Sequence, residues 1–363
     1  MKIAFFISDE GYGHAMRQKN IILELLEHSP DIEITVFTKE KIDILQNYFL
    51  DRINYVQLHN NILIDRNDNG VINLIETKNN FEKWKKNNNS WFKEVLVNFD
   101  PKTNIIISDS VPQCSLLSKK FDIQIIFIHH FSWDWFYLKA FGRDKVFFEL
   151  NMFYSENCVH FFPPLTPEEN INMHPNHKLI DFIVNRSLIA KSYIKNDKLS
   201  KGKFKLLIMN SGTKSLTNSI NELILSIPNN KIWNIFLRDQ NLTYQTKKKI
   251  LSSDNIKLIE GLQNIHDSIA NADLIVARGG YNLISEVLAL GKLALIVDEK
   301  NNPEIESNLE LIKIYQNLIP ISREKLVESV NKIMNSESLF RKKYPKQTCL
   351  GATQAMLNII NHI

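Results

Sequence analysis

A histidine and an aspartate in the first third of the chain are candidates for proton transfer. His14 follows the turn Gly11-Tyr12-Gly13, directly after an apolar segment at residues 3–7, so it is expected at the start of a helix. A neutral imidazole accepts a proton near neutral pH, and the positive end of a helix disfavours its charged form. Asp109 ends another apolar segment, where it can orient His14, act as the base itself or cap the following helix. The sequence leaves these roles open, together with a His14 that only packs the turn.

A second group of candidates, in the last third of the chain, suits an anionic ligand. The apolar segment 273–277 runs into Arg278-Gly279-Gly280, and a helical pattern carrying one acid, Glu286, follows. Glycines between a strand and a helix let backbone N–H groups approach an anion at the positive end of the helix dipole. A carboxylate near the start of that helix can accept hydrogen bonds from sugar hydroxyls. The pattern therefore favours a nucleotide sugar over a bare phosphate, with a generic βα turn and a solvated glutamate as the alternative.

Two further polar segments follow apolar ones. Ser211-Gly212-Thr213 comes after the apolar segment 204–209 and can hold a pyrophosphate without metal, although an ST-turn explains it equally and the Walker A spacing is absent. The aromatic segment from His129 to Tyr137 contains His130 and Trp133, which can line a sugar because aromatic faces stack on sugar C–H groups. The alternative is an aromatic cluster in the core. The adjacent histidines lack a third ligand at suitable spacing, so no metal site is predicted.

Composition and length favour a two-domain globular protein. The chain has 363 residues, with 44% hydrophobic and 23% charged residues and a formal net charge of +4. No apolar run reaches the roughly 20 residues of a membrane span, and no signal peptide or basic nucleic-acid-binding tract is recognised. The cysteines Cys114, Cys158 and Cys349 are far apart, which is typical of core thiols in a reducing compartment. We expect a cytoplasmic protein, either free or peripheral at the inner face of the membrane.

Apolar segments alternate with helical patterns along the whole chain, which predicts parallel, doubly wound sheets. Two sets of strands are expected, at residues 3–7, 32–37, 55–58, 104–107, 123–128 and 159–162, and at residues 204–209, 231–237, 256–259, 273–277 and 293–297. The polar stretch 60–90 is expected to be surface loop. The first domain is predicted at 1–180 together with a final helix in 346–363, and the second at 198–345.

These motifs, in this order, resemble the GT-B glycosyltransferases, in particular the MurG-like and UDP-glycosyltransferase families. The first turn is also similar to that of the pseudaminic-acid-pathway sugar-nucleotide hydrolase. The aromatic segment resembles the glycosyltransferase-like part of plant arabinokinases. The resemblance implies an α/β GT-B fold, with two doubly wound Rossmann-like domains facing a cleft and a C-terminal helix that crosses back to the first domain.

The resemblance also implies roles for individual residues. His14 and Asp109 would be catalytic, and Gly13, His130 and Trp133 would bind the sugar acceptor. The implied donor-binding residues are Ser211, Gly212, Thr213, Gly261, Leu262, Arg278, Gly279, Gly280, Asn282, Glu286, Glu304 and Asn308. One departure concerns the Gln-x-x-Asn pattern that holds the donor sugar in many members. Asn308 matches the Asn, but Ile305 replaces the Gln, so that Glu304 or Glu306 would have to substitute.

The resulting expectation is an inverting, metal-independent hexosyltransferase with a histidine base, of the kind used in cell-surface polysaccharide biosynthesis. Its substrates would be a nucleotide-sugar donor, with UDP among the candidate nucleotides, and a sugar, lipid-linked or small-molecule acceptor. No cofactor and no nucleic-acid partner are expected. A nucleotide-sugar hydrolase or epimerase on the same fold, or a catalytically silent nucleotide-sugar-binding protein, remains as an alternative.

Overall fold

The chain is described by a computed structural model that covers residues 1–67, 70–154, 157–185, 204–209, 216–228, 233–238, 242–259, 265–336, 339 and 342–362. It divides into two compact units. Unit 1 contains residues 1–65, 72–183 and 349–363, and unit 2 contains residues 66–71 and 184–348. Each unit is built around its own parallel sheet, so the expectation of two doubly wound, Rossmann-like halves is confirmed.

Unit 1 has a seven-stranded parallel sheet in the order β3-β2-β1-β4-β5-β6-β7. Its strands are β1 (Lys2–Ile7), β2 (Glu33–Phe37), β3 (Asn54–Val56), β4 (Ile105–Asp109), β5 (Ile125–Ile128), β6 (Cys158–Phe162) and β7 (His177–Leu179). The six expected strands are all present, and the short edge strand β7 is additional. β1 and β4 are neighbours although they are far apart in sequence. The strand order therefore reverses between them, which is where doubly wound sheets bind their ligands.

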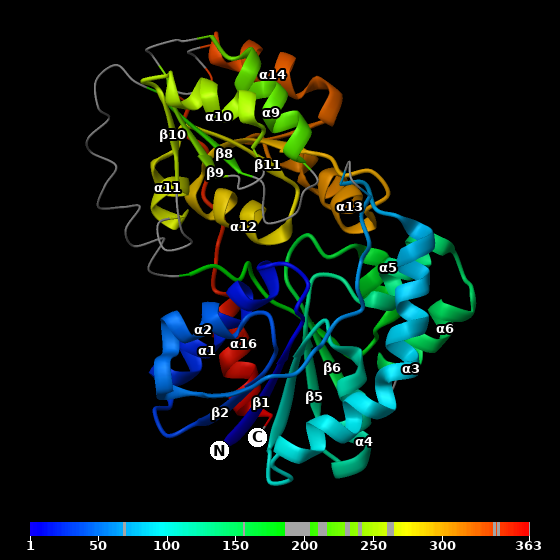
Figure 1. The fold of residues 1–363 in the computed structure, drawn as a ribbon. Coiled ribbons are helices and arrows are strands. Elements are labelled where there is room, and N and C mark those ends of the chain that lie inside the picture. The colour runs from blue at the N-terminus through cyan, green and yellow to red at the C-terminus, as the bar shows by residue number, and fades with distance from the viewer. Residues whose placement is uncertain are drawn as a thin grey trace. The chain divides into compact units, whose positions relative to one another are not determined.

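Helices cover both faces of this sheet. They are α1 (Gly13–His28), α2 (Ile42–Phe49), α3 (Leu74–Asn98), α4 (Ser115–Phe121), α5 (Trp133–Phe141), α6 (Lys145–Asn151), α7 (Glu168–Met173) and α16 (Gly351–Asn361), with short 3-10 turns η1 (Leu50–Arg52), η2 (Pro112–Cys114) and η3 (Met152–Tyr154). The apolar residues of α1, α2 and α16 pack on one face, and those of α3 and α4 pack on the other (Figure 1).

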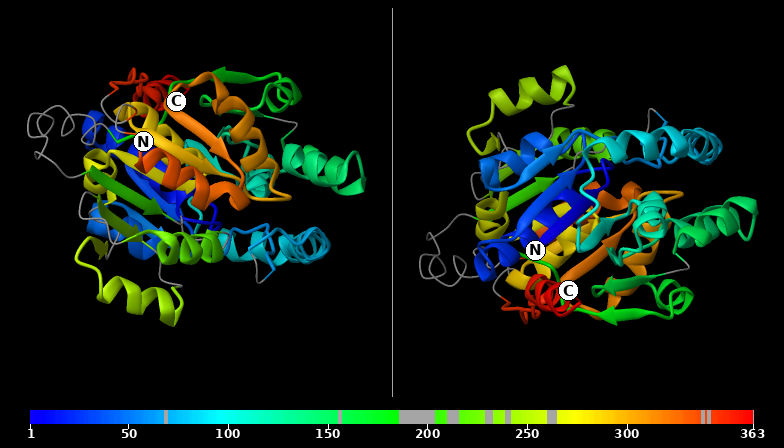
Figure 2. Two further views of the ribbon diagram at one scale, coloured as in Figure 1. Left: turned by 90° about the horizontal axis from the view of Figure 1, so that it is seen from above. Right: turned by 90° about the horizontal axis from the view of Figure 1, so that it is seen from below.

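The C-terminal helix α16 belongs to unit 1, as the sequence predicted. It packs against α1, and Thr353 donates a hydrogen bond to Glu24 of that helix at 2.9 Å. Gly351 allows this docking, since a Cβ there would lie 2.1 Å from the carbonyl oxygen of Asp181. The two chain termini consequently lie near each other within unit 1 (Figures 1 and 2).

Unit 2 has a six-stranded parallel sheet in the order β10-β9-β8-β11-β12-β13. Its strands are β8 (Phe204–Met209), β9 (Trp233–Arg238), β10 (Ile256–Leu258), β11 (Leu274–Arg278), β12 (Leu293–Val297) and β13 (Leu318–Ile321), of which β13 was not predicted. The helices are α9 (Thr217–Ser226), α10 (Tyr244–Leu251), α11 (Ile265–Asn271), α12 (Tyr281–Leu290), α13 (Pro303–Leu311) and α14 (Leu326–Met334), with turns η5 (Ile312–Ile314) and η6 (Arg323–Lys325). Residues of α9, α10 and α14 pack on one face, and α11 and α12 lie on the other (Figure 1).

The expectation of surface loop throughout residues 60–90 is wrong. Residues 74–98 form the long helix α3. The side chain of Asn73 caps the N-terminus of this helix by accepting a hydrogen bond from Glu76 N. The helix is stabilised by a stripe of inward residues at spacings of three and four, which outweighs the polar composition. This stripe comprises Phe81, Trp84, Asn88, Trp91 and Val95.

No helix in the described ranges is both long and apolar enough to span a bilayer. Cys114, Cys158 and Cys349 form no disulfide, and all three are buried, as expected of core residues.

Candidate functional site

The candidate catalytic residues of unit 1 lie where β1 and β4 end side by side. Ile7 pairs with Asp109 in the parallel register, and Ser8 N donates to the carbonyl oxygen of Asp109 at 3.1 Å. The chain leaves β1 through a turn in which Gly11 has a φ of +62°, a left-handed conformation that favours glycine. This turn starts α1 at Gly13. The fold therefore brings His14 to the strand end that carries Asp109.

His14 and Asp109 form a hydrogen-bonded pair. The distance from His14 Nδ1 to Asp109 Oδ1 is 2.7 Å; the carboxylate is fully buried, while the imidazole side chain keeps 12% of its surface exposed. An ionised carboxylate only accepts hydrogen bonds, so Nδ1 carries the proton and donates it. Arg17 Nη2 also lies 3.3 Å from this nitrogen, but it is closer to Asp109 Oδ1, at 2.5 Å, and donates there instead. The other ring nitrogen, Nε2, then has the free lone pair in the neutral ring. This tautomer is the one that a general base requires.

Two residues that the sequence analysis missed, Arg17 and Gln18, complete the surroundings of Asp109. Arg17 Nη2 and Nε donate to the two carboxylate oxygens at 2.5 and 2.9 Å, and Gln18 Nε2 donates to Oδ2 at 2.7 Å. Arg17 is itself buried. Both residues follow His14 by about one helical turn, which puts them on the same side of α1. That spacing was the signal in the sequence, but polar residues at such positions usually face solvent.

The hydrogen bonds select among the roles that the sequence left open for Asp109. Burial opposes ionisation, but the charges of Arg17 and His14 outweigh it and lower the pKa of Asp109 far below its usual range. A carboxylate held so firmly in its ionised form is a poor proton acceptor. The turn after β4 is closed by Ser108 instead, whose Oγ accepts from Val111 N at 3.3 Å. Asp109 therefore does not cap the following helix, and its ionised carboxylate holds the ring of His14 in one orientation.

His130 and Trp133 are buried beside this cluster. Arg17 Nη1 lies 3.2 Å from His130 Nδ1, and because arginine only donates, that nitrogen is the acceptor. Trp133 is 1% exposed and packs in an aromatic core cluster, with its Nε1 donating to the carbonyl oxygen of Ser110 at 2.9 Å. Ser110 has a φ of +60°, so this bond holds a strained residue next to Asp109. Burial leaves no ring face for a sugar, which corrects the predicted wall of the acceptor site in favour of the core alternative.

In unit 2, the two glycines between β11 and α12 have different surroundings. A Cβ at Gly279 would lie 3.2 Å from Ile296 Cγ2 and 3.3 Å from Ile305 Cγ2, so packing requires a glycine there. At Gly280, the N-cap of α12, a Cβ would lie 3.6 Å from Arg278 Nη2, which is ordinary contact. Gly280 thus leaves room at the start of α12, where backbone N–H groups can bind an anion.

Glu286 lies on α12 and is mostly buried, which rejects the solvated alternative. Its Oε1 is 3.3 Å from Nδ1 of His266 on α11. Neither ring nitrogen of His266 has a hydrogen-bonding partner with good geometry among the described residues. A carboxylate and an imidazole with unused capacity can bind neighbouring hydroxyl groups. Asn282 lies in the first turn of the same helix.

Helix α13 forms the last part of the predicted donor-binding region, and some of its residues have a structural role. Asn308 is buried and its Nδ2 donates to the carbonyl oxygen of Gly279 at 2.9 Å, so it positions the glycine turn rather than reaching a ligand. Ile305 is fully buried under Gly279. Its departure from the family's glutamine therefore serves packing. Glu304 is half-buried in the first turn of α13, and Glu306 is exposed on the same helix.

Five predicted donor residues cannot be placed, because Ser211, Gly212, Thr213, Gly261 and Leu262 lie outside the described residues. Within the described ranges, no group of three or more His, Cys, Asp and Glu side chains is arranged to hold a metal ion.

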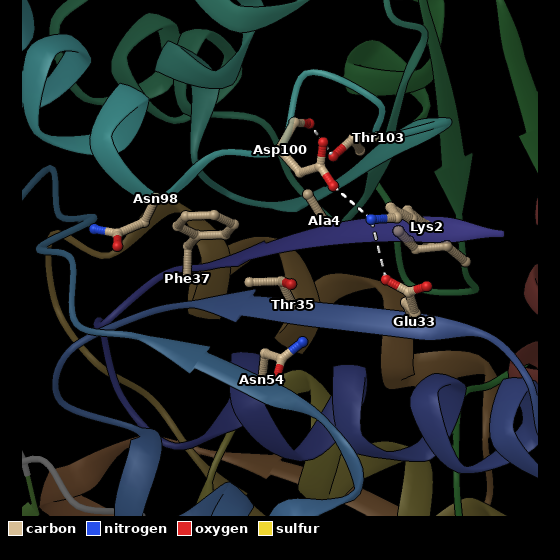
Figure 3. Close-up of a pocket in the computed structure, with 10 residues that line it drawn as sticks. Lys2, Ala4, Glu33, Thr35, Phe37, Asn54, Asn98, Asp100 and Thr103 are labelled. Carbon is tan, nitrogen blue, oxygen red and sulfur yellow. Dashed lines mark hydrogen bonds and ion pairs between the residues drawn. The ribbon is translucent and has the colours of Figure 1, made fainter.

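A cavity of about 250 Å³ in unit 1 lies away from these residues (Figure 3). Lys2, Glu33 and Asn54 on its wall are the first residues of β1, β2 and β3, so the cavity lies near the amino ends of strands whose carboxyl ends face His14 and Asp109. Its polar wall is already paired, since Lys2 Nζ contacts Asp100 at 2.6 Å and Glu33 at 3.2 Å. The cavity is therefore not part of the candidate catalytic site.

Comparison with protein families matches both halves of the chain. The description "Glycosyl transferase family 1" matches residues 1–132, and "Glycosyltransferase family 28 C-terminal domain" matches residues 212–362. The first match contains His14 and Asp109, and the second contains the glycine turn and Glu286. No curated protein sequence matches significantly.

Solved structures resemble the whole chain at low sequence identity. MurG of Acinetobacter baumannii is 14% identical with a TM-score of 0.57, and 99% of each chain is covered. The calicheamicin glycosyltransferase CalG4 is 12% identical with a TM-score of 0.65, covering 99% of this chain and 97% of that one. The UDP-GlcNAc 2-epimerase of Neisseria meningitidis, bound to UDP-GlcNAc, is 15% identical with a TM-score of 0.59, covering 99% and 100%. The shared fold is GT-B, as predicted.

Proposed function

The chain belongs to the MurG-like GT-B glycosyltransferases, and from this we propose that it transfers a hexose from a nucleotide-diphosphate sugar to a hydroxyl group, with inversion and without a metal ion. One observation carries the proposal. His14 is held by Asp109 in the tautomer whose Nε2 accepts a proton. An inverting displacement at the anomeric carbon needs such a base to activate the attacking hydroxyl.

The proposed reaction is a single displacement. The hydroxyl oxygen of the acceptor loses its proton to His14 Nε2 and forms a bond to the anomeric carbon, while the bond from that carbon to the diphosphate oxygen breaks. The negative charge that develops on the nucleoside diphosphate is stabilised by Arg278 and by the N–H groups at the start of α12. Asp109 stays ionised and stabilises the imidazolium that forms on His14. A nucleotide-sugar donor agrees with this scheme. UDP is first among the candidate nucleotides because structural neighbours are bound to UDP or to a UDP-sugar.

The test measures donor use with and without an acceptor. Purified protein is screened by thermal shift against UDP, GDP, dTDP and CMP sugars, and the stabilising donor is then incubated with candidate hydroxyl acceptors. Release of nucleotide that depends on the acceptor, in the presence of a chelator, is the expected result. The anomeric configuration of the product, read by NMR, reports inversion. A protein that binds none of these donors, that binds only a CMP sugar, which has no diphosphate, or that requires Mg²⁺ or Mn²⁺, contradicts the proposal.

A second candidate is a nucleotide-sugar hydrolase or epimerase, because an epimerase is among the structures of the same fold. The same base that activates a hydroxyl can activate water. Consumption of the sugar nucleotide without any acceptor would favour this candidate. Binding without turnover in any condition would instead favour a silent binding protein.

Glu286 gives a separate test of donor binding. Glu286→Ala is expected to weaken binding of the nucleotide by about 1–3 kcal/mol, the range for a hydrogen bond to a charged group. Isothermal titration with UDP measures this loss. The exposed Glu310 provides a matched control on a neighbouring helix, and Glu310→Ala should leave the affinity unchanged. Equal affinity of wild type and Glu286→Ala removes Glu286 from the site.

A further inference from the structure

A second fully buried carboxylate, Glu299, lies just beyond the carboxyl end of β12 and has no role in the scheme above. Its side chain has no exposed surface. A buried carboxylate is costly unless charged partners and hydrogen bonds compensate it. Its partners therefore indicate what it is there to hold.

Three side chains of unit 2 surround Glu299. Arg278 Nη1 donates to Oε2 at 2.5 Å, Asn302 Nδ2 donates to the same oxygen at 2.9 Å, and Arg66 Nε donates to Oε1 at 2.8 Å. Burial disfavours the charged carboxylate, but Arg278 and Arg66 outweigh it and lower the pKa of Glu299. Two positive charges thus face one negative charge. Because Arg66 balances Glu299, the charge of Arg278 remains available to a ligand.

The orientation of Arg278 points to that ligand. Arg278 is the last residue of β11, and its Nη2 lies 3.6 Å from where a Cβ would be on Gly280, the N-cap of α12. Its Nε is buried and has no hydrogen-bonding partner among the described residues. Glu299 engages only Nη1, on the Cδ side of the guanidinium. The opposite edge, formed by Nε and Nη2, is the one whose parallel N–H groups bind phosphate oxygens in pairs.

We propose that Glu299 is a positioning residue of the donor site: it fixes Nη1 of Arg278 so that the Nε–Nη2 edge meets the diphosphate at the start of α12. This inference rests on the proposed function, which places a nucleoside diphosphate there. Asn302 supports the arrangement, because it links Glu299 to the N-terminus of α13 by accepting hydrogen bonds from Glu304 N and Ile305 N.

A positioning role and a simple charge effect predict opposite results for Glu299→Gln. Removing a negative charge near a phosphate site would by itself strengthen binding of UDP. Loss of the anchor of Arg278 weakens it, and we expect about a 10-fold or greater increase in Kd for UDP, as for the loss of a charge-assisted hydrogen bond. Uridine, which has no phosphate, should bind Glu299→Gln and wild type alike. Isothermal titration with both compounds gives the comparison.

A second variant separates positioning from net charge and from folding. Arg66→Gln combined with Glu299→Gln restores the wild-type charge by removing the cation that Glu299 balances. The thermal unfolding of this double variant should therefore approach that of wild type, while UDP still binds weakly. Glu310→Gln, an exposed change on α13, is the matched control. If Glu299 acts through Arg278, then Glu299→Gln has no further effect on UDP affinity in a protein that already carries Arg278→Ala.

The outcomes are distinguishable. Wild-type protein that binds no UDP, GDP, CDP or dTDP overturns the proposed function. Wild-type protein that binds UDP, together with a folded Glu299→Gln or double variant that binds it equally or more tightly, overturns only the positioning role. An additive effect of Glu299→Gln and Arg278→Ala also overturns it.

Discussion

Asp109 in unit 1 and Glu299 in unit 2 are both buried carboxylates that are paired with arginine. Both are fully buried carboxylates at the carboxyl end of a parallel strand, and arginine holds both in the ionised form. They differ in how they use the arginine. Asp109 occupies the paired Nε and Nη2 edge of Arg17, whereas Glu299 takes only Nη1 of Arg278.

The difference follows the chemistry that each region is proposed to perform. In unit 1 the arginine is occupied by Asp109 and His130, and the group left with free capacity is the imidazole of His14. In unit 2 the carboxylate holds the arginine, and the group left with free capacity is the guanidinium of Arg278. One arrangement presents a base and the other presents a positive charge. Buried ion pairs are weak evidence for stability alone, so this asymmetry is better explained by orientation.

The largest expected effect tests the base. His14→Ala should lower kcat by about 10²–10⁴-fold, the range for loss of a general base, and leave the Kd of UDP unchanged. Steady-state kinetics and titration measure the two quantities. His28→Ala, an exposed change in the last turn of the same helix, is the control. Normal turnover by His14→Ala would contradict the proposal that the unit 1 cluster presents a base.

A second prediction concerns stability. Asp109→Asn removes one charge of the buried ion pair between Asp109 and Arg17, so the free energy of unfolding should fall by about 3–5 kcal/mol. Urea denaturation measures this loss, and Glu33→Gln, at the exposed start of β2, should change little. The affinity for UDP should stay near that of wild type, in contrast to Glu299→Gln. Weaker UDP binding by a folded Asp109→Asn would show that the two clusters do not have separate tasks.

Variants of Gly279 and Gly280 test the proposed phosphate-binding role of unit 2. Gly279→Ala forces a methyl group against Ile296 and Ile305 and should cost about 1–3 kcal/mol of stability, as overpacking does. Gly280→Ala meets no such obstacle and should unfold at nearly the wild-type temperature, but its methyl group occupies the space proposed for the phosphate. Its affinity for UDP should therefore fall. Thermal unfolding and titration of both variants check this, and the reverse pattern would contradict the assignment.

The smallest effect is a difference in acid sensitivity. Burial lowers the pKa of His129 and His160 in unit 1 well below 6.5, so the folded state keeps them neutral while the unfolded state binds protons. Their contribution to stability is complete above pH 6.5 and is lost as the pH falls, by on the order of 1 kcal/mol each near pH 5.5.

The lowered pKa values of Asp109 and Glu299 act later, since stability from a depressed carboxyl group is present above the unfolded values of 3.8 and 4.5 and is lost as the pH falls further. Hydrogen exchange followed by mass spectrometry at pH 7.5 and 5.5 should therefore show unit 1 loosening before unit 2. Equal or earlier loosening of unit 2 would contradict this order.

Strand positions and the glycine turns could be predicted from the sequence because their signals are local. Runs such as Ile105–Ile107 are apolar at every position, and buried parallel strands require that. The helix within residues 60–90 was not predicted, because the polar composition of this segment was given more weight than the spacing of its apolar residues. The stretch Lys85-Lys-Asn-Asn-Asn-Ser90 is polar, yet Trp84 and Trp91 lie seven residues apart on one side of a helix.

The order of the motifs along the chain was sufficient to indicate two doubly wound halves and to select His14, Asp109 and Glu286 as candidates. It was not sufficient to say which polar side chains are buried or which edge of an arginine is occupied. Arg17 reaches Asp109 across 92 positions, and Glu299 meets Arg66 across 233. Such contacts depend on strand order and on helix orientation, which packing of the whole unit sets and which no local pattern of residues encodes.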